Sequence, residues 1–323
     1  MTKQWKDQIE VDHNHDGIDR RGFLKCMAWA GTGTLCVMQG GVLKSFALSR
    51  FNESDATAAA RAELSFAQIS DSHMGFNKAA NTDVAGTLKA AVDKLNALPS
   101  APEFLLHTGD ISHLSKPEEF DAVEQILKSA SAQQVFYVPG EHDVTDGDGK
   151  QYLDRYGKNT QGAGWYSFEK RGVHFVGLVN VMNLKAGGLG SLGPEQLEWL
   201  KKDLEPLGTS TPIVVFAHIP LWSVYPDWGW GTDDSAQALE LLKRFGSVAV
   251  LNGHIHQTMQ KVEGSVTFHT AASTAFPQPH PGQAEGPGPM KVPAEELRKL
   301  LGITDVNFVR GRDAVAIVDG SLA

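Results

Sequence analysis

Short apolar runs recur along the chain, and polar residues follow each of them directly. Runs of this length predict strands that are buried on both faces of a sheet. In an open α/β sheet the chemistry collects at the carboxyl ends of such strands, so we expect the functional site there. The runs are residues 66–69, 135–138, 213–216, 248–251 and the start of 105–110.

Between these runs, apolar residues recur at the three- and four-residue spacing of one helix face. A further pattern, with Gly or polar residues between short strand-like runs, predicts hairpins. The segment 277–293 is dense in proline and glycine and predicts a loop. The expected helices are 82–98, 117–130, 194–204, 235–245 and 294–301, and the expected hairpins pair 165–170 with 173–179, 258–262 with 266–270, and 306–309 with 314–318.

The first 63 residues differ from the rest. Arg20 and Arg21 precede Phe23 and a weakly apolar, glycine-broken run that ends near Ala47. This segment resembles a twin-arginine export signal, although an apolar run of this length is also long enough for a membrane anchor. We expect a signal peptide over 1–48, a linker over 49–63 and one catalytic domain over 64–323. The resemblance implies that the twin-arginine translocase exports the folded protein to the periplasm.

Composition and charge limit which partners and which metal ligands the protein can have. The formal charge of −9 gives no basic surface for duplex nucleic acid. Both cysteines, Cys26 and Cys36, lie in the segment that we expect to be removed. Imidazole and carboxylate groups therefore remain as ligands, and these suit zinc, iron and manganese.

Histidines and carboxylates follow all five strand-like runs: Asp71 and His73, then Asp110, then Glu141, His142 and Asp143, then His218, and finally His254 and His256. In this order and spacing they resemble the motifs of the calcineurin-like metallophosphoesterases. The resemblance covers residues 64–270. It implies an α/β fold, a four-layer α/β/β/α sandwich with mixed sheets, and two metal ions.

The resemblance assigns the ligands position by position. Asp71, His73, Asp110 and His256 would hold one ion, and Asp110, Glu141, His218 and His254 the other. Asp110 would bridge them. Two such ions share a hydroxide, lower the pKa of the bound water and clamp phosphate oxygens. His142 would assist the leaving group and Asp143 would orient His142.

Glu141 departs from the family pattern, which has asparagine there. Two divalent ions, a hydroxide, Asp71 and Asp110 sum to +1, and a ligating Glu141 brings this sum to 0. We therefore expect Fe(III) paired with a divalent ion of Fe, Mn or Zn. In the alternative, the longer Glu141 side chain points away and binds nothing.

Other residues are candidates for substrate contact. His113 stands where the purple acid phosphatases carry a metal-binding tyrosine, and we expect it beside the ligands or facing the substrate. The loop 220–231 is aromatic and contains Trp222, Tyr225 and Trp228. It could stack on a ring or acyl chain, or pack on the domain or a partner. A short likeness of 269–279 to the cyclic-nucleotide phosphodiesterase branch favours a small phosphodiester over a monoester.

Two other functions compete with a binuclear phosphoesterase. One is a metal-binding envelope protein without turnover, in which Glu141 abolishes activity and loop 220–231 binds a partner. The other is a hydrolase of a carbon ester or amide, because the same activated hydroxide attacks carbonyl carbon.

Overall fold

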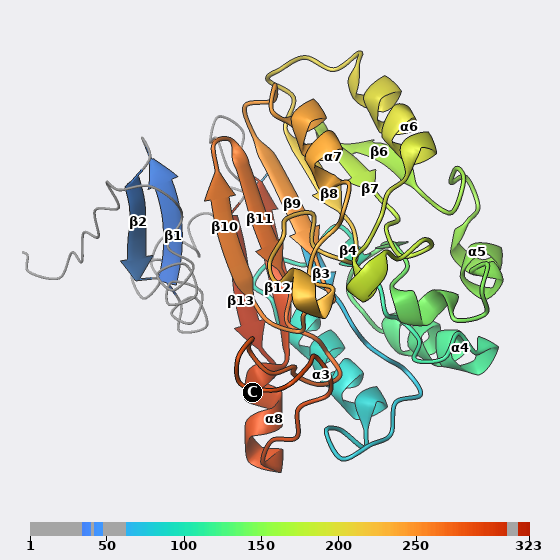
Figure 1. The fold of residues 1–323 in the computed structure, drawn as a ribbon. Helices are drawn as coiled ribbons and strands as arrows, with labels where there is room; N and C mark the ends of the chain where they lie inside the picture. Colours follow the sequence, from blue (N-terminus) through green and yellow to red (C-terminus); the bar gives the residue numbers. More distant parts are fainter. Residues whose placement is uncertain (1–33, 40–41, 48–62, 309–315) are drawn as a thin grey trace, which may run out of the picture.

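Two β-sheets form the centre of the molecule (Figure 1). The structure is a computed structural model, and it describes residues 34–39, 42–47, 63–308 and 316–323. The smaller sheet has the strand order β13-β12-β3-β4-β5 and the larger one β2-β1-β10-β11-β9-β8-β7-β6. The strands of the smaller sheet are β3 (Leu64–Ile69), β4 (Leu105–His107), β5 (Val135–Tyr137), β12 (Gly302–Phe308) and β13 (Ala316–Ser321). Those of the larger sheet are β1 (Thr34–Gln39), β2 (Val42–Ala47), β6 (Tyr166–Lys170), β7 (Val173–Gly177), β8 (Ile213–Phe216), β9 (Val248–Asn252), β10 (Met259–Glu263) and β11 (Val266–Thr270).

The two sheets pack face to face through alternate residues of their central strands. Leu64 and Phe66 of β3 share a buried cluster with Val214 and Phe216 of β8. The Phe66 ring meets that of Phe175 at 5.3 Å and 82°. This inner cluster explains why the strand sequences are continuously apolar, since the other face of each strand is covered as well.

Helices cover both outer faces, which completes the predicted four layers (Figure 1). Ile69 of β3 packs with Leu88 and Phe120 from the helices on the smaller sheet. Val215 of β8 packs with Leu200 and Leu242 from those on the larger sheet. The first pair is α3 (Val84–Asn96) and α4 (Pro117–Leu127), and the second is α6 (Pro194–Leu204) and α7 (Ser235–Leu242).

The carboxyl ends of five strands meet at one edge of this sandwich. β3, β4 and β5 run parallel within the smaller sheet, and β8 and β9 run parallel within the larger. Gln68 of β3 donates from Nε2 to the Asn252 carbonyl of β9 at 3.1 Å, which joins the two edges. The loops that follow the five strands are thereby brought together.

The predicted strands, helices and hairpins of the catalytic domain are all found, with shifted ends. The last hairpin begins earlier than expected, at Gly302, and its predicted connecting residues lie partly outside the described ones. The hydrophobic pattern did not predict α5 (Lys150–Tyr156), in which Tyr152 is the one buried residue. The helix α8 (Ala294–Leu300) lies where 294–301 was expected.

The predicted export signal lies largely outside the described residues, including Arg20 and Arg21. Its described part forms β1 and β2, which pair antiparallel, and β1 joins β10 through Val37 and Val262. None of the helices that the structure describes is both apolar enough and long enough to cross a bilayer.

Candidate metal centre

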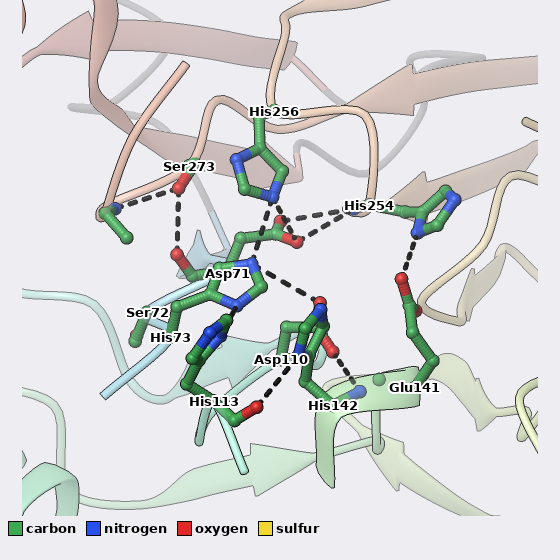
Figure 2. Close-up of polar contacts among 12 residues, drawn as sticks. Asp71, Ser72, His73, Asp110, His113, Glu141, His142, His254, His256 and Ser273 are labelled. Atoms are coloured by element: carbon green, nitrogen blue, oxygen red, sulfur yellow. Dashed lines mark hydrogen bonds and ion pairs between the residues drawn. The ribbon is translucent and has the colours of Figure 1, made fainter. Parts of the chain in front are cut away.

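Three of the five strand-end loops, those after β3, β4 and β9, hold polar residues in an unusual backbone conformation. Asp71, His73, Asp110, His254 and His256 have φ values of 55°, 39°, 51°, 72° and 53°. Non-glycine residues rarely adopt this left-handed region, and such residues cluster at functional sites. The conformation turns these side chains toward a common centre (Figure 2).

One group of donors comprises Asp71, His73 and His256, whose ligand atoms lie within 4.8 Å of one another. His256 Nε2 is 3.2 Å from Asp71 Oδ1 and 3.1 Å from His73 Nε2. All three residues are buried.

A second group comprises Glu141, His218 and His254. Glu141 Oε2 is 3.0 Å from His218 Nε2, and Glu141 Oε1 is 3.0 Å from His254 Nδ1.

Asp110 lies between the groups. Its Oδ2 atom is 3.4 Å from His73 Nε2 in the first group and 3.5 Å from His218 Nε2 in the second. Its Oδ1 atom accepts a hydrogen bond from the His142 amide at 2.9 Å. One carboxylate therefore faces both groups.

Four buried atoms at the centre form no hydrogen bond with the described residues, although three of them lie in the 3.0 Å ion-pair contacts given above: Glu141 Oε2, His218 Nε2, and both ring nitrogens of His254. A buried polar atom without a partner is costly unless something else satisfies it. Imidazole nitrogens and carboxylate oxygens at this spacing fit metal cations. The residues present therefore suit the two ions that the sequence motifs predict.

The electrostatics of the cluster agree with this fit. Burial raises the pKa of Glu141, but attraction from His254 and His218 outweighs it, so the pKa is well below its ordinary value. Burial, together with His256 and His142, holds the pKa of His73 well below its ordinary value. Burial lowers the pKa of His218, yet Asp110 and Glu141 raise it well above normal. The carboxylates of Asp110 and Glu141 therefore favour positive charge at the centre, which a bound cation would supply.

His142 and His113 stack beside the first group, with ring centroids 4.7 Å apart and planes inclined by 17°. His142 Nδ1 is 2.8 Å from the His113 carbonyl oxygen, which can only accept. The other nitrogen, Nε2, is therefore the one without a proton when the ring is neutral. Burial lowers the pKa of His142, but Asp110 and Glu141 outweigh it and raise the pKa.

The predicted contact between Asp143 and His142 is not formed. The Asp143 carboxylate instead accepts hydrogen bonds from the amides of Ile111, Ser112 and Gly140 at 3.1, 2.8 and 2.9 Å, and from Ser112 Oγ at 2.8 Å. The Asp143 carboxylate is therefore engaged by these four donors, and the carbonyl of His113 orients the His142 ring in its place. Through these hydrogen bonds Asp143 links the loop after β4 to the loop after β5.

The sequence also matches a known family. Residues 64–258, more than half of the 323-residue chain, match the calcineurin-like phosphoesterases. The chain belongs to this family. It is a metal-dependent phosphoesterase, a hydrolase of phosphoric ester bonds.

Two curated relatives show what this phosphoesterase is similar to. It is 26% identical over 219 residues to a 3',5'-cyclic-nucleotide phosphodiesterase of Nostoc sp., covering 66% of this chain and 79% of the relative. It is 26% identical over 235 residues to the glycerophosphodiester phosphodiesterase GpdQ of Enterobacter lignolyticus, covering 66% and 78%. Among solved structures, a dimetal phosphatase from Danio rerio has the same fold, with a TM-score of 0.58 at 14% identity over 81% of this chain and 97% of that one.

A pocket of about 310 Å³ opens over the metal centre of the phosphoesterase. His113 and Trp228 line it, and their contact with a substrate stays a prediction. Trp222 does not: it is 5% exposed, and its ring packs 5.2 Å from that of Phe268 in the outer core of the larger sheet. Tyr225 packs edge-on against Trp228 at 5.4 Å and supports it.

Several residues of the pocket wall were not predicted from the sequence. Trp230 belonged to the aromatic loop but was not singled out. Phe276 and Gln278 lie in the segment 269–279, whose one signal in the sequence was its likeness to the cyclic-nucleotide phosphodiesterase branch. Phe76 and Lys78 gave no signal, because nothing local distinguishes them from ordinary loop residues. The wall also includes Pro287, Gly288 and Pro289.

Three other buried histidines lie outside the two donor groups, and His107 is the one nearest to the centre. His107 is 2.8 Å from Ser72 Oγ, and burial lowers its pKa to about 3. His174 lies between Glu169 and Asp203, and His269 contacts Asp319 at 3.0 Å. None of the three belongs to the candidate ligand groups among the described residues.

Proposed function

We propose that this phosphoesterase hydrolyses a small phosphodiester at a centre of two metal ions. The observation that carries the proposal is the position of Asp110, whose Oδ2 atom lies at nearly equal distances from a histidine of each donor group. A carboxylate shared by two sets of ligands is the arrangement expected of a bridged pair of cations.

The ligands of the proposed centre come from both groups. Asp71, His73 and His256 would hold one ion, Glu141, His218 and His254 the other, with Asp110 between them. When bound, the ions activate the attacking water and neutralise charge on the phosphate. The chain itself fixes their positions, because the ligands stand on loops anchored to two packed sheets.

His142 serves the leaving group in this proposal. It lines the pocket beside the first donor group, and its Nδ1 proton is held by the His113 carbonyl. When the ring is protonated, Nε2–H is the free donor and can pass its proton to the departing oxygen. The carboxylates of Asp110 and Glu141 favour that protonated form.

A diester is favoured over a monoester by the two relatives, both named phosphodiesterases. The same names count against a metal-binding protein without turnover. The aromatic and proline wall of the pocket leaves room for an ester arm beyond the phosphate.

A panel of small phosphodiesters, phosphomonoesters and carboxylic esters tests the proposal, with protein purified together with its own metals. We expect diesters to have the highest kcat/KM, and inorganic phosphate to inhibit. Faster hydrolysis of a carboxylic ester, or no turnover of any ester at full metal occupancy, would contradict it.

The charge of Glu141 affects which metal ions the centre would favour. Its carboxylate points into the cluster, 3.0 Å from a nitrogen of each of two histidines. A third carboxylate weakens the positive charge of the centre, and a trivalent ion would restore it. We propose Fe(III) with a divalent ion as the native pair. Elemental analysis and Mössbauer spectra of the purified protein test this, and a fully active enzyme with two divalent ions would refute it.

We also propose that the protein is exported folded through the twin-arginine route to the periplasm, on the strength of Arg20 and Arg21 before the apolar run. Replacing both arginines with lysine should leave the full-length protein in the cytoplasm. Cell fractionation measures this, and unchanged export of the double variant would refute it.

A further inference from the structure

We infer that His113 is a positioning residue for the metal ligand His73: its ring accepts the Nδ1 proton of His73, so that His73 Nε2 is free to bind a cation. The inference rests on the proposed two-metal centre. It concerns a contact that the sequence motifs do not specify.

The other buried histidines of the centre show the pattern that His73 has to satisfy. His218 Nδ1 donates to the Thr108 carbonyl at 2.7 Å, and His256 Nδ1 donates to the Phe276 carbonyl at 2.6 Å. Each bond fixes the tautomer whose Nε2 lone pair faces the centre. Metal-binding histidines commonly donate their second N–H to a carbonyl or carboxylate in this way.

Within the described part of the chain, no carbonyl or carboxylate forms a hydrogen bond with the outward nitrogen of His73, Nδ1. Its Nε2 atom faces the centre, 3.4 Å from Asp110 Oδ2. Its Nδ1 atom faces His113 Nδ1 at 3.4 Å (Figure 2). A hydrogen bond between two imidazole nitrogens requires one to donate and the other to accept. If His113 Nδ1 accepts, His73 keeps its lone pair on Nε2, where the cation would bind.

The surroundings hold the His113 ring in this orientation. It stacks on His142 and meets the edge of Phe76 at 5.2 Å. Its backbone amide donates to Glu119 Oε2 at 3.1 Å, and that buried carboxylate also accepts from the Leu114 amide at 2.8 Å. Little rearrangement is therefore needed before His113 can act on His73.

Two substitutions at His113 distinguish the effect of losing the hydrogen-bond acceptor from the effect of losing the aromatic ring. His113→Phe keeps an aromatic ring for stacking but removes the acceptor, whereas His113→Asn offers its amide oxygen near the position of Nδ1. Both keep the backbone carbonyl that holds His142. His280→Phe is the control, because His280 is an exposed histidine of the loop after β11.

Titration of the metal-free proteins with Co²⁺, followed by visible absorption and calorimetry, is the test. We expect two ions in the wild type and in the control. His113→Phe should bind one ion about 10- to 100-fold more weakly, the range seen when an outer partner of a ligand is lost. His113→Asn should bind both ions nearly as tightly as the wild type.

Wild-type affinity for both ions in His113→Phe would overturn the inference, and so would an equal loss in His113→Asn. If the Phe variant does not fold, a loss of Co²⁺ affinity of about 10-fold or more in His113→Asn still overturns the inference. Fewer than two ions in the wild type would count against the proposed function instead, independently of His113.

A double-variant cycle distinguishes positioning from general destabilisation. If His113 acts through His73, adding His113→Phe to His73→Ala should cause no further loss of Co²⁺ affinity. Additive losses would show that His113 acts by another route and would overturn the inference.

Discussion

At the scale of single residues, the site depends on side chains whose partners come from distant parts of the sequence. His142 is oriented by the carbonyl of His113, and Asp143 holds three backbone amides from two loops. The motif alone suggested that Asp143 served its neighbour His142. Adjacent residues often point apart, so adjacency in sequence was a poor guide to contact here.

The role of His142 predicts a dependence on the leaving group. His142→Asn should lower kcat by about 10²- to 10⁴-fold for diesters with alkyl leaving groups, the range for loss of a general acid. It should affect nitrophenyl esters far less, because nitrophenolate departs without a proton. Steady-state kinetics with both kinds of ester measure the difference, and equal losses would exclude proton donation by His142.

His174, on the larger sheet, predicts a pH-dependent stability. Burial lowers its pKa, but hydrogen bonds with Asp203 and Glu169 outweigh this and raise it above 6.5. The stabilisation is therefore fully present below about pH 6.5. It is lost as the pH rises through the raised pKa.

Relative to the wild type, His174→Asn should be destabilised by about 1 kcal/mol in acid and by less in alkali, since partly exposed ion pairs contribute little. Denaturant unfolding across pH 6–9 measures the free energy of unfolding. A difference that stays constant with pH would contradict the prediction.

At the scale of elements, glycines let the strand-end loops approach closely. Gly109 has φ of +96°, and a Cβ there would lie 2.5 Å from His218 Nδ1. Gly140 has an ordinary φ of −96°, but its Cβ would lie 2.0 Å from Asp110 Oδ1 and 2.4 Å from Asp110 N. The loops after β4, β5 and β8 can therefore pack this closely only because Gly109 and Gly140 have no side chain.

Gly140→Ala should displace Asp110 while leaving the fold intact, because alanine tolerates the backbone conformation of Gly140. A misplacement of about 1 Å at a site can cost about 10²-fold in rate. We expect a loss of that order in kcat/KM with weaker metal binding. Gly208→Ala is the control, since the nearest atom to its Cβ is 3.9 Å away. Wild-type activity of Gly140→Ala would contradict the close contact.

At the scale of the whole molecule, the proposed ligands join two sheets. Asp71, Asp110 and Glu141 follow strands of the smaller sheet, and His218 and His254 follow strands of the larger. Ions bound at their meeting edge would hold the sheets together. A ligand that binds only the folded state stabilises it in proportion to the logarithm of its concentration.

Removal of the metals should therefore lower the Tm. At 100 times the Kd, each ion contributes roughly 2.7 kcal/mol, and each kcal/mol corresponds to roughly 2–4 °C for a domain of this size. Chelation should lower the Tm by about 5–10 °C per ion lost. Calorimetric scans with and without chelator measure this, with His218→Asn as a variant whose response should be smaller. An unchanged Tm would argue against ions bridging the sheets.

The sequence by itself determined the order of the strands and of the α-helices in the catalytic domain except α5, because apolar periodicity is a local property. It also determined which strand ends carry imidazole and carboxylate. The tertiary structure alone decided that Trp222 packs in the core while Trp228 faces the pocket, and that His73 meets His113. These outcomes depend on loop conformations and on how two sheets pack, and both are set by contacts between residues that are distant along the chain.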